Sequence, residues 1–374
     1  MASKNRRQNV EFEVILPATG EQIQDHLYLA GDFNGWHTAD PDYHIKQTRN
    51  GKYKLKTKLS VGAHAFKVVR GSWQTVETDH EGGAIANRTM LVEKQSGRTP
   101  IEVRLEVAGF ADSFPVPAPP STISSNVTIL EEAFEIPQLA RKRRIWIYLP
   151  ADYQQHTTQH YPVIYMQDGQ NLFDAATAFS GEWGIDKYLN TLGAEKQCIV
   201  VGIDNGGNNR MQEYNPYTNK QFGKGEGKAY VEFIVKTLKP YIDLHYRTQK
   251  EAKYTTVSGS SMGGLISYYA AIRYPDIIGN AGVFSPSFWI APDIYQVTKK
   301  LLPELSGSNF YFYGGEREGE DLISHLKLTT SLLAGNPKIH TSLEINPEGT
   351  HQEIYWGEAF KAFYEWLLAR QAVH

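Results

Sequence analysis

Apolar and polar residues alternate with a period of two in the first third of the chain. The alternation is clearest in Glu11–Leu16, Tyr53–Leu59 and Ile101–Val107, and this period is typical of strands with one buried face. Asn50-Gly51 has the composition of a tight hairpin turn. No long stretch of this region has a helical period. The pattern therefore predicts an all-β, immunoglobulin-like sandwich of about 100 residues.

A proline- and serine-rich segment at residues 113–125 separates this region from a second pattern. Such segments favour extended, semi-rigid backbone, so we expect a linker between one domain at 9–112 and another at 126–374. In the second domain, short apolar runs alternate with helical stretches. The expected strands are Tyr161–Met166, Cys198–Ile203, Tyr254–Val257 and Phe310–Tyr313, and the expected helices are Ala229–Leu244, Leu265–Arg273 and Glu353–Leu368. This alternation predicts an α/β fold, with a mostly parallel sheet covered by helices on both faces.

The second domain contains Gly-x-Ser-x-Gly in Gly259-Ser-Ser-Met-Gly263, with Ser261 at its centre. This spacing suits a nucleophile on a sharp turn from a strand to a helix, because the flanking glycines let neighbouring backbone pass closely. A β-branched strand precedes the pattern and a helical stretch follows it. Ser260 lacks the flanking glycine spacing, so we expect Ser261 to be the nucleophile.

A serine nucleophile needs a base to take its proton, and in this kind of fold the chain order is serine, acid, histidine. The histidines after Ser261 are His325, His340, His351 and His374. His325 falls in a predicted helix, and His340 precedes a predicted strand. His351 lies in a loop between that strand and the last helix, which is where the base is expected.

The acid should lie in the loop after the strand that ends at Tyr313. That loop offers Glu316, Glu318, Glu320 and Asp321. The position directly after the strand favours Glu316 or Glu318, and of the two we choose Glu318, although an acidic loop can also be solvated surface alone. The acid would hold the imidazole tautomer and stabilise the imidazolium.

The oxyanion of an acyl-transfer intermediate needs two N–H donors. The N–H of Met262, directly after the nucleophile, is expected to be one of them. The second should come from a loop after an early strand, and Gln170, which follows the tight-turn residue Gly169, is our prediction. No His, Asp and Glu cluster has the spacing of metal ligands, so we expect neither a metal nor a cofactor.

At these residues the second domain resembles the esterase D / enterochelin esterase-like branch of the α/β hydrolases, which includes feruloyl and acetylxylan-type esterases. The resemblance covers nearly all of residues 126–374 and implies an α/β-hydrolase fold with a triad of Ser261, Glu318 and His351. Its motifs, in chain order, are Arg144–Pro150, Asp168–Asp174, Gly181–Asp186, Val201–Asn205, Gly259–Gly264 and Phe284–Trp289.

The same resemblance suggests a substrate pocket in loops that follow strands, where open α/β sheets bind ligands. Its expected lining is Trp183, Arg210, Glu213, Tyr214 and Trp289. The alternative is that the tryptophans are packing residues and that Arg210 and Glu213 form a structural ion pair.

The first domain resembles the starch- or glycogen-binding modules found on amylases and on glycogen-sensing subunits. The resemblance rests on Leu29–Trp36, on Phe66–Trp73 and on the Ala-Asn-Arg that follows Ile85. It implies a glucan site at Trp36, Lys67, Trp73 and Asn87, because flat aromatic side chains suit the apolar face of a sugar. The alternatives are that the tryptophans pack inside the sandwich, or that the module only covers the esterase. Enterochelin esterases also carry an N-terminal β-domain, which is not used as a starch binder.

The net charge and the single cysteine limit which partners and which cellular compartment we expect. A net charge of −3 gives no basic footprint, so we expect neither nucleic acid nor a membrane as partner. Cys198 is the single cysteine and opens an apolar run, which predicts a buried strand residue. We expect a cytoplasmic protein, or a secreted one if a signal peptide has been removed.

The sequence leaves three functional hypotheses. The first is a serine carboxylic ester hydrolase that acts on an acylated carbohydrate or a small ester, with a module that binds α-glucan. The second keeps the chemistry but makes the substrate a siderophore trilactone of the enterobactin type. The third is a glucan-binding protein without catalytic activity.

Overall fold

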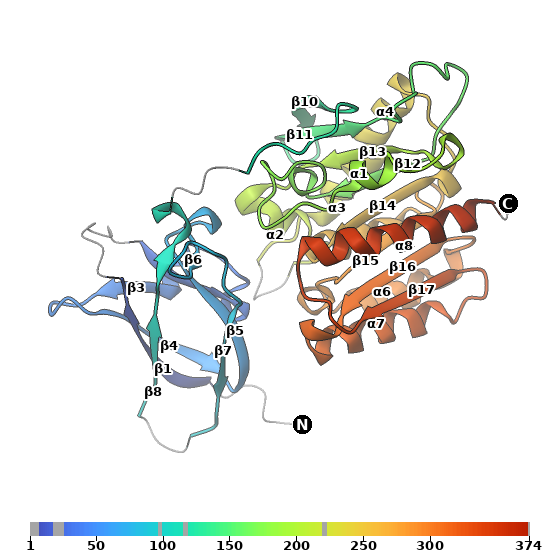
Figure 1. Cartoon of the computed structure of the whole chain (residues 1–374). Coiled ribbons are helices and arrows are strands. Elements are labelled where there is room, and N and C mark those ends of the chain that lie inside the picture. Colours follow the sequence, from blue (N-terminus) through green and yellow to red (C-terminus); the bar gives the residue numbers. More distant parts are fainter. Residues whose placement is uncertain (1–6, 18–25, 96–98, 115–118, 219–222, 373–374) are drawn as a thin grey trace. The chain divides into compact units, whose positions relative to one another are not determined.

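The chain folds into two compact units, Met1–Ala118 and Pro119–His374. The computed structural model describes residues 7–17, 26–95, 99–114, 119–218 and 223–372 (Figure 1). Part of the predicted linker, residues 115–118, lies outside this description. Another part is bound to the second unit, since Ser121 donates to Asp174 over 2.9 Å and the N–H of Ser124 donates to Asp186 over 2.9 Å.

The first unit is built on a seven-stranded sheet with the order β7-β5-β2-β3-β4-β1-β8, and β6 and β9 form a separate pair. Neighbouring strands of the large sheet are antiparallel, except β1 and β8, which are parallel. Among the described residues of this unit, helical structure is limited to short 3-10 turns. The strands are β1 Arg7–Ile15, β2 Leu27–Gly31, β3 His44–Gln47, β4 Tyr53–Ser60, β5 Gly62–Val69, β6 Glu77–Thr78, β7 Arg88–Val92, β8 Ile101–Glu106 and β9 Gly109–Phe110.

The period-two pattern of the first unit corresponds to these strands. Alternate residues of β1, such as Val10, Phe12 and Val14, are at most 3% exposed and belong to one apolar core with Leu29 and Phe66. Their neighbours in β1 face outward, as expected for a sheet with one buried face. The immunoglobulin-like class of this unit stays a prediction.

The second unit has an eight-stranded sheet with the order β10-β11-β13-β12-β14-β15-β16-β17. In this order, the six strands that begin with β13 and include β12 are parallel to one another, and β10 and β11 add an antiparallel edge. The strands are β10 Val127–Ile136, β11 Arg141–Tyr148, β12 Val163–Gln167, β13 Ile199–Ile203, β14 Thr255–Ser260, β15 Asn280–Phe284, β16 Asn309–Gly315 and β17 His340–Asn346.

Helices cover both faces of this sheet (Figure 1). Along β13, Val201 belongs to one apolar cluster with α3 to α7, and Val200 belongs to another with α1 and α8. Cys198, directly before β13, is fully buried as predicted. The helices are α1 Ile185–Leu189, α2 Arg210–Glu213, α3 Gly227–Phe233, α4 Lys239–His245, α5 Met262–Arg273, α6 Ile294–Leu301, α7 Glu320–Leu333 and α8 Glu353–Ala372.

One predicted helix, Ala229–Leu244, contains a change of winding. A π-helical segment, Ile234–Leu238, joins α3 to α4, which the period of the sequence does not indicate. In the described part of the chain, every helix is too short or too polar to span a bilayer.

Candidate active site

Ser261 occupies the turn between β14 and α5 in a strained conformation. Its φ is 57° and its ψ is −120°, which few residues with a side chain adopt. A Cβ atom on Gly259 would lie 2.9 Å from Gln167, and one on Gly264 would lie 2.9 Å from the carbonyl oxygen of Phe284. Glycine is required here because strands on both sides pass too closely for a side chain. The strand, the sharp turn and the helix expected around Ser261 are all present.

Glu318 and His351 are hydrogen-bonded to each other. Glu318 follows β16, His351 lies between β17 and α8, and Oε2 of Glu318 is 2.5 Å from Nδ1 of His351. The side chain of Glu318 is 3% exposed and that of His351 is 49% exposed. Although burial raises the pKa of Glu318, the hydrogen bonds from His351 and Ser285 hold it below its ordinary value. The other acids that the sequence offered are exposed: Glu316, Glu320 and Asp321.

Two glycines let the histidine loop approach the end of β16. A Cβ atom on Gly315 would overlap the carbonyl oxygen of Gly349, and that oxygen accepts the N–H of Arg317 over 3.2 Å. A backbone hydrogen bond and close packing therefore hold the loop that carries His351 against the segment that carries Glu318.

The end of β15 connects the serine turn with this pair. The carbonyl of Phe284 accepts the N–H of Ser261 over 2.9 Å, and the next residue, Ser285, donates its hydroxyl to Glu318 over 2.6 Å. The hydroxyl of Ser261 lies 3.2 Å from that of Ser287. Over the described residues, no hydrogen bond joins Ser261 to His351. Since Glu318 occupies Nδ1, Nε2 is the ring nitrogen of His351 that does not face the carboxylate.

The expected oxyanion loop lies beside the serine turn. Asp168 directly follows β12 with a φ of 57° and precedes the 3-10 turn Gly169–Asn171. A Cβ atom on Gly263 would be 3.1 Å from a carboxylate oxygen of Asp168. Within the described chain, the N–H groups of Gln170 and Met262 have no backbone acceptor outside their own helical segments, since both lie in the first turn of such a segment. They are thus available to a ligand.

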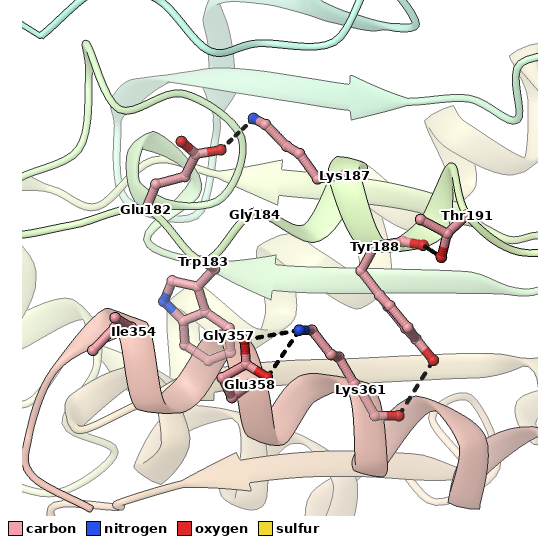
Figure 2. A pocket seen from close by; sticks show the side chains of 10 residues that line it. All are labelled: Glu182, Trp183, Gly184, Lys187, Tyr188, Thr191, Ile354, Gly357, Glu358 and Lys361. Atoms are coloured by element: carbon pink, nitrogen blue, oxygen red, sulfur yellow. Dashed lines mark hydrogen bonds and ion pairs between the residues drawn. The ribbon is translucent and has the colours of Figure 1, made fainter.

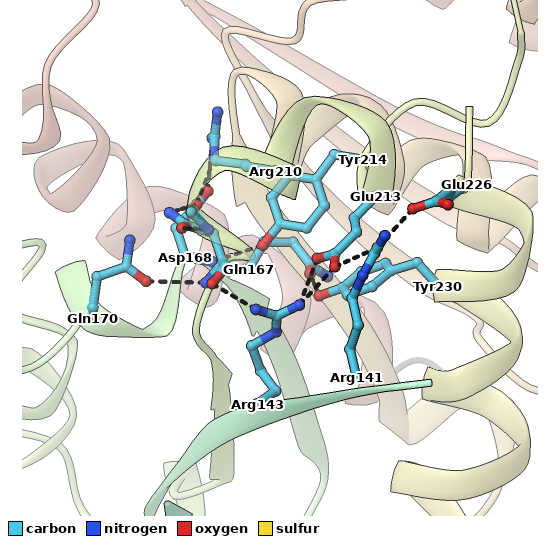
Figure 3. Close-up of polar contacts among 12 residues, drawn as sticks. Arg141, Arg143, Gln167, Asp168, Gln170, Arg210, Glu213, Tyr214, Glu226 and Tyr230 are labelled. Atoms are coloured by element: carbon cyan, nitrogen blue, oxygen red, sulfur yellow. Dashed lines mark hydrogen bonds and ion pairs between the residues drawn. The ribbon is translucent and has the colours of Figure 1, made fainter. Parts of the chain in front are cut away.

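A partly buried ionic network supports this loop (Figure 3). Arg210 donates to both carboxylate oxygens of Asp168 over 2.7 and 2.8 Å. Arg143 donates to Glu213 over 2.7 Å and to the carbonyl of Asn205 over 3.0 Å. The side-chain amide of Asn205 in turn donates to Asp168 over 2.8 Å. The network links the buried Glu213 to the loop through a chain of charge-assisted hydrogen bonds.

This network changes the interpretation of three residues expected to line the pocket. Glu213 and Tyr214 are 0% exposed, so they lie beneath the site rather than on its surface. The ring of Tyr214 stacks under the guanidinium of Arg210 at 5.2 Å. Arg210 and Glu213 both form ion pairs, but not with each other as the alternative interpretation had it. In the described structure Arg210 pairs with Asp168, and Glu213 pairs with Arg141 and Arg143.

The two tryptophans expected in the pocket differ in exposure. Trp289 is 41% exposed and lies two residues after Ser287. Trp183 is 6% exposed and packs against Phe284 and Trp356 at 5.1 and 5.9 Å. Trp183 also lines a cavity of about 450 Å³ between α1 and α8, and the lining of this cavity does not include Ser261, Glu318 or His351 (Figure 2).

Sequence reasoning missed Ser285, Ser287 and Trp356 as site residues. The first two belong to a motif that carried the resemblance, and their position directly after β15 was the available signal. Trp356 lies inside a predicted helix, where an aromatic residue indicates packing. Among the described residues, no group of three His, Cys, Asp or Glu side chains could hold a metal ion.

The four residues predicted to bind glucan lie in the first unit. The half-buried rings of Trp36 and Trp73 are 6.1 Å apart at an angle of 37°. Asn87 is exposed. Lys67 is 9% exposed and its ammonium donates to the carbonyl of Ile85, and burial lowers its pKa. Lys67 therefore points inward, whereas the two rings form an aromatic pair.

Known proteins resemble this chain in sequence. The uncharacterized protein YbbA of Bacillus subtilis (strain 168) is 26% identical over 246 residues, which are 62% of this chain and 94% of that protein. An α-amylase of Niallia circulans is 40% identical over 83 residues, which are 22% of this chain and 6% of the amylase.

Solved structures share the fold. The BES protein from Bacillus cereus matches with a TM-score of 0.56 and 18% identity, over 66% of this chain and 97% of that chain. A ferulic acid esterase matches with a TM-score of 0.52 and 16% identity, over 66% and 99%. The enterobactin esterase FES from Shigella flexneri, in the presence of enterobactin, matches with a TM-score of 0.52 and 14% identity, over 96% and 92%.

A family model agrees with the geometry of the second unit. The model named Esterase matches residues 136–366, which include Ser261, Glu318 and His351. The match covers more than half of the chain, and the structural neighbours have the corresponding α/β-hydrolase-like fold. The chain therefore belongs to the Esterase family.

Proposed function

We propose that the chain is a serine carboxylic ester hydrolase that works through an acyl-enzyme, with Ser261 as nucleophile, His351 as base and Glu318 as acid. The observation that carries the proposal is the buried carboxylate of Glu318 hydrogen-bonded to His351 at 2.5 Å. This pair is linked through β15 to the strained turn of Ser261. A serine, an imidazole and an orienting carboxylate are the parts that acyl transfer needs.

In the first step, Oγ of Ser261 attacks the ester carbonyl carbon while Nε2 of His351 takes the hydroxyl proton. The N–H groups of Met262 and Gln170 stabilise the oxyanion of the tetrahedral intermediate. The imidazolium then gives its proton to the leaving alcohol as the C–O bond breaks. Water, deprotonated by His351, releases the acid and restores Ser261. Glu318 remains ionised throughout, which agrees with its lowered pKa.

We propose an acylated carbohydrate or a small ester as substrate, with the first unit as an α-glucan-binding module. The paired rings of Trp36 and Trp73 support the second part, because adjacent aromatic faces suit a sugar chain. The partial similarity to an α-amylase also supports it.

Hydrolysis of p-nitrophenyl acetate by the full chain tests the proposal. Ser261→Ala should abolish turnover and labelling by a fluorophosphonate probe, whereas Ser260→Ala serves as the matched control. Unchanged turnover in Ser261→Ala would overturn the nucleophile assignment. Affinity for glucan without any probe labelling of the wild-type chain would instead support a non-catalytic glucan-binding protein.

The second candidate is a siderophore trilactone esterase, which the similarity in fold to an enterobactin esterase favours. An anionic iron complex needs free cationic side chains. Arg143 and Arg210, near the predicted oxyanion loop, are paired with Glu213 and Asp168, which disfavours this substrate. Rates measured side by side on ferric enterobactin and on acetylated sugars separate the two candidates.

A further inference from the structure

One carboxylate oxygen of Glu318 is occupied by contacts that the base does not use. Oε2 faces His351, whereas Oε1 accepts the N–H of Gly315 over 2.9 Å and the hydroxyl of Ser285 over 2.6 Å. The side chain of Glu318 is 3% exposed, so these two protein hydrogen bonds replace the hydrogen bonds that water would make to an exposed carboxylate. The rotation of the carboxylate is therefore fixed at Oε1.

Ser285 has a backbone conformation that few residues with a side chain adopt. It follows β15 with a φ of 41° and is 1% exposed. Its N–H donates to the carbonyl of Tyr313 in β16 over 2.8 Å. Such a conformation persists only where the surrounding structure imposes it. The neighbouring strands thus hold the backbone of Ser285 so that its hydroxyl points toward the end of β16, where the segment with Glu318 begins.

Trp356 sets the direction of the Ser285 hydroxyl. An indole N–H can only donate, and Nε1 of Trp356 lies 2.9 Å from Oγ of Ser285. Because Oγ accepts that bond, its own proton is free to go to Oε1 of Glu318. The ring of Trp356 also meets the imidazole of His351 edge to face, with centroids 4.8 Å apart at 88°. One buried side chain therefore contacts the base directly and the acid through Ser285.

We propose that Ser285, oriented by Trp356, is a positioning residue that directs Glu318 toward His351. The proposal rests on the proposed triad. Ser285 bonds to neither the hydroxyl of Ser261 nor the imidazole of His351 in the described structure, so its effect on catalysis passes through Glu318. Without the Ser285 hydroxyl, the carboxylate loses one of two bonds at Oε1 and can rotate away from the imidazole.

A double-mutant cycle on the full chain tests this. Ser285→Ala should lower kcat for p-nitrophenyl acetate about 10- to 100-fold, as for loss of a hydrogen bond to a charged group, with KM nearly unchanged. Glu318→Ala should lower kcat further. The double variant should then equal Glu318→Ala within about twofold, because a residue that acts only through Glu318 has no effect once Glu318 is gone.

Two further variants test the role of the Trp356 N–H and control for the loss of a buried hydroxyl. Trp356→Phe retains the ring but removes the N–H, and it should lower kcat in the wild-type background and not in the Glu318→Ala background. Ser308→Ala removes a buried hydroxyl that has no partner in the described structure and should leave kcat unchanged.

Wild-type kcat in Ser285→Ala would overturn the proposal, and so would a further loss when Ser285→Ala is added to Glu318→Ala. Failure of the proposed function looks different. It would appear as full activity in Ser261→Ala or in Glu318→Ala, whatever the result at Ser285.

Discussion

The hydroxyl oxygens of Ser261 and Ser287 lie 3.2 Å apart. The two residues also meet through the backbone, since the N–H of Ser287 donates to the carbonyl of Ser261 over 3.0 Å. Ser287 is 7% exposed and follows β15 by three residues. The predicted nucleophile is therefore hydrogen-bonded to another serine, which is buried. Mutation and covalent labelling are needed to show which of the two hydroxyls reacts.

We expect Ser287→Ala to keep kcat for p-nitrophenyl acetate within about tenfold of wild type, because a neutral hydrogen bond contributes about 0.5–1.5 kcal/mol. Ser261→Ala should lose at least about a thousandfold. Mass spectrometry of fluorophosphonate-labelled Ser287→Ala should find the label on Ser261. A label on Ser287 in the wild-type chain would reverse the assignment.

Replacing Glu318 should change both catalysis and the pH dependence of stability. Glu318→Gln removes the charge that stabilises the imidazolium, so kcat should fall by about 10²- to 10⁴-fold. The pKa of Glu318 is below its ordinary value of 4.5 in the folded chain. Its ionised form therefore stabilises the fold above pH 4.5, and this contribution is lost as the pH falls through the folded pKa.

Urea unfolding at several pH values checks the second effect. The difference in unfolding free energy between wild type and Glu318→Gln should shrink as the pH is lowered from 6 toward 3. A difference that stays constant over this range would show that the charge of Glu318 does not contribute to stability.

Gly315 should be needed for activity more than for folding. A Cβ atom there would overlap the carbonyl oxygen of Gly349, so Gly315→Ala should displace the loop that carries His351. We expect kcat to fall at least about tenfold, as small misplacements of catalytic groups do, with a smaller change in melting temperature. Gly307→Ala is the control, since open space surrounds that glycine, although its φ of 75° costs stability. Equal kcat in Gly315→Ala and wild type would contradict the prediction.

The parts of the site that the sequence predicts are those set by local pattern. Ser261 is found because glycines at fixed spacing are required where a Cβ atom would lie within 3 Å of a neighbouring strand. The loop position of His351 follows from its place between a strand and a helix. The strands of the second unit are visible because both faces of its sheet are buried, which makes each strand an apolar run.

The parts that could not be predicted depend on contacts distant in sequence. Glu213 resembles a surface acid, yet it is buried because Arg141 and Arg143 of β11 neutralise it. Trp356 resembles a packing residue of a helix, and only the meeting of α8 with the end of β15 brings its N–H to Ser285. Local periodicity contains no information about such partners.

His64 and Asp32 should make the stability of the first unit depend on pH. Nδ1 of His64 lies 2.7 Å from a carboxylate oxygen of Asp32, and this hydrogen bond raises the pKa of His64 above 6.5. A raised pKa means that the pair stabilises the fold fully below pH 6.5 and loses this contribution as the pH rises through the folded pKa. His64→Gln should lower the melting temperature of the first unit more at pH 6 than at pH 9. Calorimetry of the full chain measures this, and an equal decrease at both pH values would contradict it.

The aromatic pair of the first unit provides the test of glucan binding. If a sugar chain stacks on Trp36 and Trp73, then Trp36→Ala removes one of two adjacent faces and should weaken binding to soluble amylose at least about fivefold, the loss expected when a central aromatic contact of 1 kcal/mol or more is truncated. Affinity electrophoresis in amylose measures the change.

The matched control is Trp289→Ala, which removes an exposed tryptophan from the second unit and should leave the affinity for amylose unchanged. Trp36→Ala should in turn leave the hydrolysis of p-nitrophenyl acetate unchanged, because that ester is too small to need a glucan contact. Unaltered amylose affinity in both Trp36→Ala and Trp73→Ala would assign these rings to packing. The first unit would then have no glucan site at the aromatic pair, and recognition of the proposed ester substrate would fall to the second unit without a glucan contact from this pair.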